Sequence, residues 1–123
     1  MSKKHAEGSR GHYKLEAWKR ARELVLSVYR LMQAFPKEET FDLAAQLSRT
    51  AVAIPSNIAE GAARAGKREF AQFLNIARGS LSELETQLLI STDLGYIKSG
   101  DPVFELVDLV SRLITGLRKS IQS

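Results

Sequence analysis

Large apolar residues recur along the chain at intervals of three and four, the spacing that places them on one face of an α-helix. The first series begins at Leu15 and ends at Phe35, because Pro36 bars the residue before it from the helical region. Further series cover about residues 40–62, 67–94 and 102–121. β-Branched residues never alternate with polar ones over a useful length. The pattern predicts four helices and no strand.

Residues at the ends of these series have the chemistry of helix caps. Thr40 offers a hydroxyl N-cap for the second helix. Gly95 suits the left-handed position just beyond the third helix. The pair Asp101 and Pro102 opens the fourth, with a carboxylate cap followed by a proline where no backbone donor is needed.

The second helix contains Pro55, which removes a backbone donor and pushes away the carbonyl of Ala51. The apolar face nevertheless continues from Ile54 to Ile58, so one bent helix is favoured over two. Gly61 has two interpretations, a point of close approach between helices or the start of fraying.

Short corners join the four helices, and such links bring consecutive helices side by side in opposite directions. The predicted fold is all-α, an up-down-up-down antiparallel four-helix bundle with a proline-bent second helix. We expect this domain to occupy residues 13–123 and residues 1–12 to form a flexible basic tail.

Composition removes most familiar catalytic chemistry. The chain has no cysteine, which excludes disulfides, thiolate metal sites and a cysteine nucleophile. Its two histidines, His5 and His12, both precede the first helix, and no Glu-x-x-His sequence occurs. We therefore expect no catalytic residue, no metal, no cofactor and no small-molecule substrate. The longest apolar run covers only residues 51–54, so we expect no membrane span and a cytoplasmic location.

Positive charge is concentrated near the start of the chain. Residues 1–22 hold seven Lys or Arg and two Glu, a net charge of +5, whereas the whole chain carries +4. Such a segment can contact a phosphate backbone, or it can be a solvated tail that maintains solubility. A second basic group surrounds the corner between the second and third helices. The candidate polyanion contacts are Lys14, Lys19, Arg20, Arg22, Arg49, Arg64, Lys67 and Arg68.

Polar residues also form stripes on the second and third helices. Asn57 and Glu60 lie on one stripe, and Arg78 and Glu85 on the other. If the stripes are buried, the four residues form an interhelical polar network, because buried charges need partners. The alternative is that Glu60 and Arg64 are an ordinary surface pair four residues apart.

The helices carry more apolar residues than one bundle seam requires. Beside the main stripes, the surplus consists of Val103, Val107 and Ile114 on the fourth helix, Ile76 and Ile90 on the third, and Leu24, Leu26 and Leu31 on the first. This surplus predicts contact with another subunit, although small proteins also expose single apolar side chains freely.

Two sequence runs resemble a known family. Residues 47–61 include Ile-Pro-Ser-Asn-Ile-Ala-Glu-Gly, and residues 70–88 include Ala-Arg-Gly-Ser-Leu-Ser-Glu-Leu-Glu. Together with Leu94-Gly95-Tyr96-Ile97, they resemble the bacterial four-helix-bundle family, also called S23 ribosomal proteins or 23S rRNA intervening-sequence proteins. The resemblance spans roughly residues 13–120.

The resemblance implies a bundle with a proline-bent second helix that assembles into a ring-like homopentamer, and it brings no catalytic residue. The family name reflects genes located in intervening sequences of 23S rRNA. We therefore hypothesise a non-enzymatic, oligomeric binding or scaffolding module for RNA or DNA, acting through phosphate contacts. The alternative is a protein-binding adaptor with no nucleic-acid role.

Overall fold

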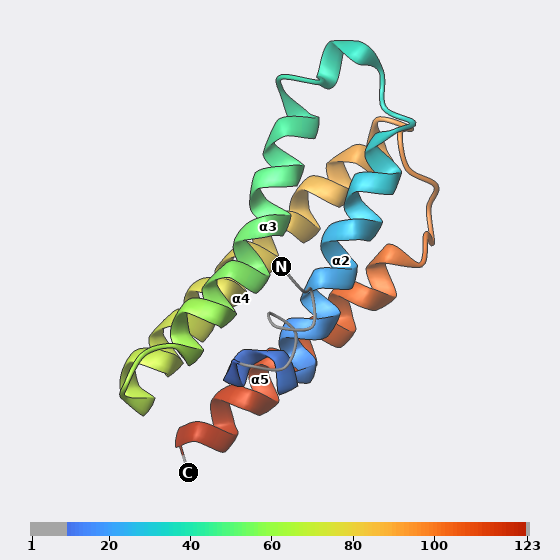
Figure 1. Ribbon diagram of the computed structural model, residues 1–123. Coiled ribbons are helices and arrows are strands. Elements are labelled where there is room, and N and C mark those ends of the chain that lie inside the picture. Colours follow the sequence, from blue (N-terminus) through green and yellow to red (C-terminus); the bar gives the residue numbers. More distant parts are fainter. Residues whose placement is uncertain (1–9, 123) are drawn as a thin grey trace.

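The computed structural model describes residues 10–122 of the chain (Figure 1). Its long helices are α2 (Glu16–Met32), α3 (Leu43–Ala62), α4 (Lys67–Asp93) and α5 (Val103–Gln122), with short 3-10 turns η1 (Gly11–Lys14) and η2 (Lys37–Glu39). Both α2 and α4 pack against α3 and against α5, which closes a four-helix bundle. Within residues 10–122 there is no strand. The prediction of an all-α four-helix bundle is confirmed.

One hydrophobic core runs through the bundle and takes side chains from every long helix. Its largest fully buried apolar side chains are Leu24, Val28, Leu47, Ile54, Ile58, Leu74, Leu84, Leu88, Val110 and Ile114. Each contributes about 1.5–3 kcal/mol relative to an exposed side chain. These residues follow the three-four spacing of the sequence, so the same periodicity that forms the helices also fills the core.

Part of the expected apolar surplus belongs to this core. Leu24, Val103, Val107 and Ile114 are buried, so these four are not the part of the surplus that can face another subunit. Leu26, Ile76 and Ile90 are exposed, and for them the predicted subunit contact stays a prediction. On α5 the inward stripe runs from Val103 through Val107 to Ile114, whereas the neighbouring stripe of Leu106, Leu113 and Leu117 is only partly buried. Both stripes have helical spacing, and only the positions of α2 and α4 select between them.

The helix α3 continues through Pro55, as the unbroken apolar face predicted. Two side chains bond to carbonyls in the turn before the proline: Ser56 Oγ donates to Val52 O at 2.8 Å, and Asn57 Nδ2 donates to Ala53 O at 2.7 Å. Such back-bonding accompanies helix bending. The bend itself remains a prediction.

Gly61 lies at a close approach between α3 and α4. A Cβ atom at this position would lie 2.7 Å from the Cβ of Phe73 and 3.3 Å from the carbonyl oxygen of Phe70. This confirms the close-approach interpretation, because a buried glycine in the last turn of α3 leaves room for α4.

Two of the three predicted caps are confirmed. Gly95 has φ +84°, and its N–H bonds Thr92 O at 2.9 Å as part of a Schellman motif. Asp101 Oδ1 accepts the N–H of Val103 at 2.8 Å. Thr40 does not cap α3, because the chain first turns through η2 and α3 begins only at Leu43.

Candidate nucleic-acid interface

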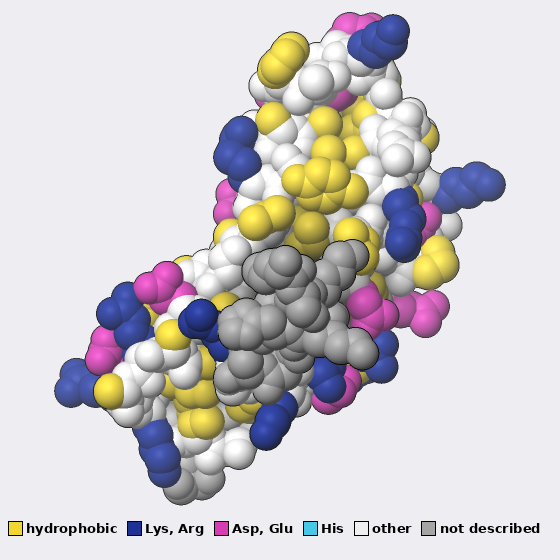
Figure 2. Space-filling model, in the orientation of Figure 1, with side chains coloured by type: hydrophobic (Ala, Val, Ile, Leu, Met, Phe, Trp, Pro, Cys, Tyr) yellow, Lys and Arg dark blue, Asp and Glu magenta, His cyan; other side chains and the backbone are white. Residues whose placement is uncertain are grey.

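Because neighbouring helices alternate in direction, three separate segments meet at one end of the bundle (Figure 1). We call residues 10–23, 60–70 and 116–122 the basic end. They hold ten Lys or Arg and four Glu, a net charge of +6. The ten are Arg10, Lys14, Lys19, Arg20, Arg22, Arg64, Lys67, Arg68, Arg118 and Lys119. Figure 2 shows dark blue side chains around this lower end of the molecule.

The opposite end has the opposite sign. We call residues 29–42 and 89–105 the acidic end, which holds three Lys or Arg and six Asp or Glu, a net charge of −3. Its two corners are tied by Tyr96, whose hydroxyl donates to Glu39 Oε2 at 2.8 Å and whose ring packs against Phe35. The described part of the chain is therefore polarised along its length, and such a field orients an approaching polyanion.

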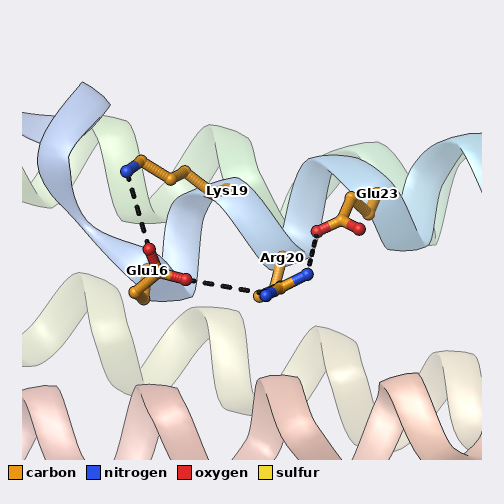
Figure 3. A network of polar contacts seen from close by, with 4 residues as sticks. All are labelled: Glu16, Lys19, Arg20 and Glu23. Carbon is orange, nitrogen blue, oxygen red and sulfur yellow. Dashed lines mark hydrogen bonds and ion pairs between the residues drawn. The ribbon is translucent and has the colours of Figure 1, made fainter.

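At the start of α2, surface ion pairs hold part of the basic end in place (Figure 3). Glu16 lies 3.5 Å from Lys19 Nζ and 3.6 Å from Arg20 Nε, and Arg20 Nη1 donates to Glu23 Oε2 at 2.8 Å. All four side chains are exposed by 43% or more, so each pair is worth at most about 1 kcal/mol. A phosphate group can replace these glutamates at little cost.

The corner between α3 and α4 supplies the second basic group. Arg64 Nη2 bonds Glu60 Oε2 at 2.6 Å, and the guanidinium lies 5.0 Å from the ring centroid of Phe73. Lys67 and Arg68 are exposed in the first turn of α4. They line a groove of about 440 Å³ that also contacts Ile121 at the end of α5. Gly66 caps α4 without a side-chain bond, so the first amides remain available to an anion.

The predicted basic residues do not all share this end. Arg49 is exposed on α3 but lies thirteen residues before Ala62, about 20 Å along the helix from the basic end. The structure therefore gathers seven of the eight predicted contacts and separates Arg49 from them.

The predicted interhelical network of Asn57, Glu60, Arg78 and Glu85 is not formed. Asn57 bonds within α3, and Glu60 pairs with Arg64, as the surface alternative expected. Arg78 and Glu85 line a polar groove of about 250 Å³ with Asp108 and Ser111 of α5. No hydrogen bond or ion pair among residues 10–122 joins Asn57 or Glu60 of α3 to Arg78 or Glu85 of α4. The stripes face different neighbours and stay accessible to water, so their charges need no mutual partner.

Sequence reasoning missed three basic residues, Arg10, Arg118 and Lys119. The last two lie in the final turns of α5, and Arg118 Nε is buried without a hydrogen-bond partner in the described part of the chain. The alternating helix directions could have identified these two residues. In an antiparallel bundle with an even number of helices, the last helix ends on the side of the bundle where the first helix begins.

An aromatic cluster, also missed, lies among these charges. The ring centroid of His12 is 4.5 Å from that of Tyr13 and 4.8 Å from that of Trp18, and Tyr13 and Trp18 are 5.0 Å apart. The guanidinium of Arg22 lies 4.8 Å from the Trp18 centroid. Burial, and secondarily the charge of Arg10, lowers the pKa of His12. We expected His12 in a flexible tail, but it belongs to η1. Residues 1–9 of that tail lie outside the described residues.

Comparison with protein families now adds to this geometry. A model of the family described as 23S rRNA-intervening sequence protein matches residues 13–116. The chain belongs to this family. The match covers the aromatic cluster from Tyr13 onward and both groups of predicted basic residues, but it ends before Arg118. Comparison with curated proteins found no match.

The name of the 23S rRNA-intervening sequence protein family refers to ribosomal RNA and not to an enzyme. Two further findings concern membrane spans and metal sites in the described residues. No helix within residues 10–122 is long and apolar enough to cross a membrane. The same residues contain no group of three or more acidic or histidine side chains arranged to hold a metal ion.

Proposed function

We propose that the chain is a non-enzymatic, oligomeric binding module of the cytoplasm whose basic end contacts the phosphate backbone of RNA or DNA. The observation that carries the proposal is the net charge of +6 collected at one end of the bundle from three separate segments. The reference to rRNA in the family name agrees with it.

Phosphate contacts account for most of the affinity in non-specific nucleic-acid binding, and each basic contact releases counterions. The exposed side chains of Lys14, Lys67, Arg68 and Lys119 take part in no ion pair within residues 10–122. They can therefore meet phosphates without first losing a protein partner. Assembly into a homo-oligomer, a pentamer by family resemblance, multiplies these contacts and raises the affinity for a long polyanion.

The test compares charge removal at the two ends of the molecule. Lys67→Ala combined with Arg68→Ala removes two positive charges from the basic end, and Lys37→Ala combined with Lys98→Ala removes two from the acidic end. Affinity for structured RNA and duplex DNA is measured over a series of salt concentrations. We expect the first variant to bind more weakly, with a logarithmic salt slope shallower by about two units.

The second variant serves as the control, because it changes the net charge equally but leaves the basic end intact. Equal effects of the two variants would show that overall charge, and not this end, determines binding. Absence of any binding by the unaltered chain at low salt would overturn the proposal.

A protein-binding adaptor is the second candidate, favoured by the apolar surface of the acidic end. Tyr29, Phe41, Leu89, Ile90 and Leu94 are all exposed there, and Phe41 retains 95% of its accessible surface. A groove between α2 and α3, lined by Tyr29 and Met32 among others, adjoins Thr40. If polyanions fail to bind while this surface mediates protein contacts, the adaptor is the correct function.

A further inference from the structure

The aromatic cluster at the basic end combines the two features of a surface that binds single-stranded nucleic acids. Its rings are supplied by His12, Tyr13 and Trp18, and all three side chains are only partly buried. Basic residues are interspersed with these rings and come directly after them in the same stretch of chain, namely Arg10, Lys14, Lys19, Arg20 and Arg22. Single-strand binding proteins pair such a charged track for the backbone with aromatic rings for the bases.

We propose that this cluster stacks an unpaired base of a single-stranded nucleic acid while the neighbouring basic side chains hold its phosphates. This inference rests on the proposed function and deepens it, because it specifies unpaired strands as the preferred ligand. A duplex would be bound through its phosphates by the same basic side chains, but its paired bases would not contact the rings.

The rings are held in place before any ligand arrives. In η1, the N–H of Tyr13 bonds Arg10 O at 3.1 Å and the N–H of Leu15 bonds His12 O at 3.0 Å. Trp18 packs against the hydrophobic core from the first turn of α2. A platform that is already ordered loses little conformational entropy on binding, which favours affinity.

Arg22 shows how a base can reach the indole. Its guanidinium lies over the Trp18 ring, and its side chain is exposed, with no ion pair among the described residues. A base can take the place of the guanidinium over the ring, and the displaced guanidinium can then bond the adjacent phosphate. The cation–π contact is thereby exchanged for a stacked base and a charged hydrogen bond.

The competing explanation is that the cluster only covers the lower end of the core. A cluster with that role needs only apolar packing, and it would bind strands with and without bases equally. Stacking, in contrast, requires a direct contact between a base and Trp18, which is the single tryptophan of the chain. Intrinsic tryptophan fluorescence therefore reports on this cluster alone.

The experiment titrates the full chain at low salt with oligouridylate, with oligothymidylate and with an abasic oligomer of the same length. The three carry equal numbers of phosphates, and only the first two carry bases. We expect either base-bearing strand to quench Trp18 fluorescence and to bind at least about fivefold more tightly than the abasic strand. Oligodeoxyuridylate, which has the base of oligouridylate on a deoxyribose backbone, isolates the 2′-hydroxyl and shows whether RNA or DNA is favoured.

Two variants test the rings directly. Tyr13→Leu and Trp18→Leu should lower the affinity for base-bearing strands toward that of the abasic strand and leave abasic binding unchanged. Val52→Ala truncates an exposed apolar side chain of α3 outside both ends of the molecule, and it should change neither affinity. If Trp18→Leu fails to fold, Tyr13→Leu and the fluorescence of the unaltered chain still decide the result.

Equal affinity for abasic and base-bearing strands, without quenching, would overturn the stacking proposal and leave phosphate binding by the basic end intact. Failure of all three oligomers to bind at low salt would overturn the proposed function as well.

Discussion

At the scale of single residues, the glycines of the long helices differ in what surrounds them. Gly61 is enclosed by α4, whereas at Gly79 no atom lies within 4 Å of an added Cβ apart from its chain neighbours and the adjacent backbone of its own helix. In an open helical position, alanine is more stable than glycine by about 1 kcal/mol. At Gly61 the new methyl group would lie 2.7 Å from the Cβ of Phe73, and overpacking of this kind costs about 1–3 kcal/mol.

We therefore predict opposite outcomes for two identical substitutions. Gly61→Ala should lower the free energy of unfolding measured in urea, and Gly79→Ala should raise it by up to about 1 kcal/mol. Because both variants add the same methyl group to a helix, the second controls for helix propensity. Stabilisation of similar size by both variants would show that α3 and α4 are less closely packed than the structure indicates.

At the scale of elements, the start of α5 depends on one side chain. Asp101 Oδ1 accepts the N–H of Val103 at 2.8 Å, where the helix would otherwise present an unpaired donor. Asp101→Ala should lower the free energy of unfolding by about 1 kcal/mol, the usual value of an N-cap. Chemical denaturation followed by circular dichroism measures this difference.

Asp93 provides the matched control for this cap. It is an exposed aspartate in the last turn of α4, where its negative charge meets the negative end of the helix dipole. Asp93→Ala should leave stability unchanged or raise it slightly. A loss of equal size in both variants would attribute the effect to net charge and not to the cap.

At the scale of the whole molecule, the excess of positive charge lies at one end, and exposed apolar side chains lie at the other. The basic end carries +6, whereas the acidic end carries −3 and exposes Phe41 and Leu94. Nucleic acid and a second copy of the chain could therefore bind without competing for the same surface. We assign the proposed oligomer contact to the acidic end on this basis.

Phe41→Ser tests this assignment. Because Phe41 is 95% exposed, its replacement should not alter the free energy of unfolding, but it should lower the mass measured by light scattering at a fixed concentration. Ile76→Ser, at an exposed position of α4 outside the acidic end, should preserve the mass. A monomeric unaltered chain, or dissociation caused only by Ile76→Ser, would contradict the assignment.

The sequence by itself determined the helices, two of their caps and the passage of α3 through Pro55. These features depend on interactions within a few residues: apolar spacing, a carboxylate before a proline, or a glycine after the last turn. The family resemblance, carried by residues 47–61 and 70–88, is likewise a property of local sequence and is confirmed by the match over residues 13–116.

Only the tertiary structure decided which apolar stripe of α5 faces inward and which charges lie together. Helical periodicity is the same for both stripes, and the neighbouring helices select Val103 and Val107. Lys14, Lys67 and Lys119 are far apart in the sequence, but alternating helix directions bring all three to one end. Local interactions thus determine the elements, whereas their packing determines the surface on which function depends.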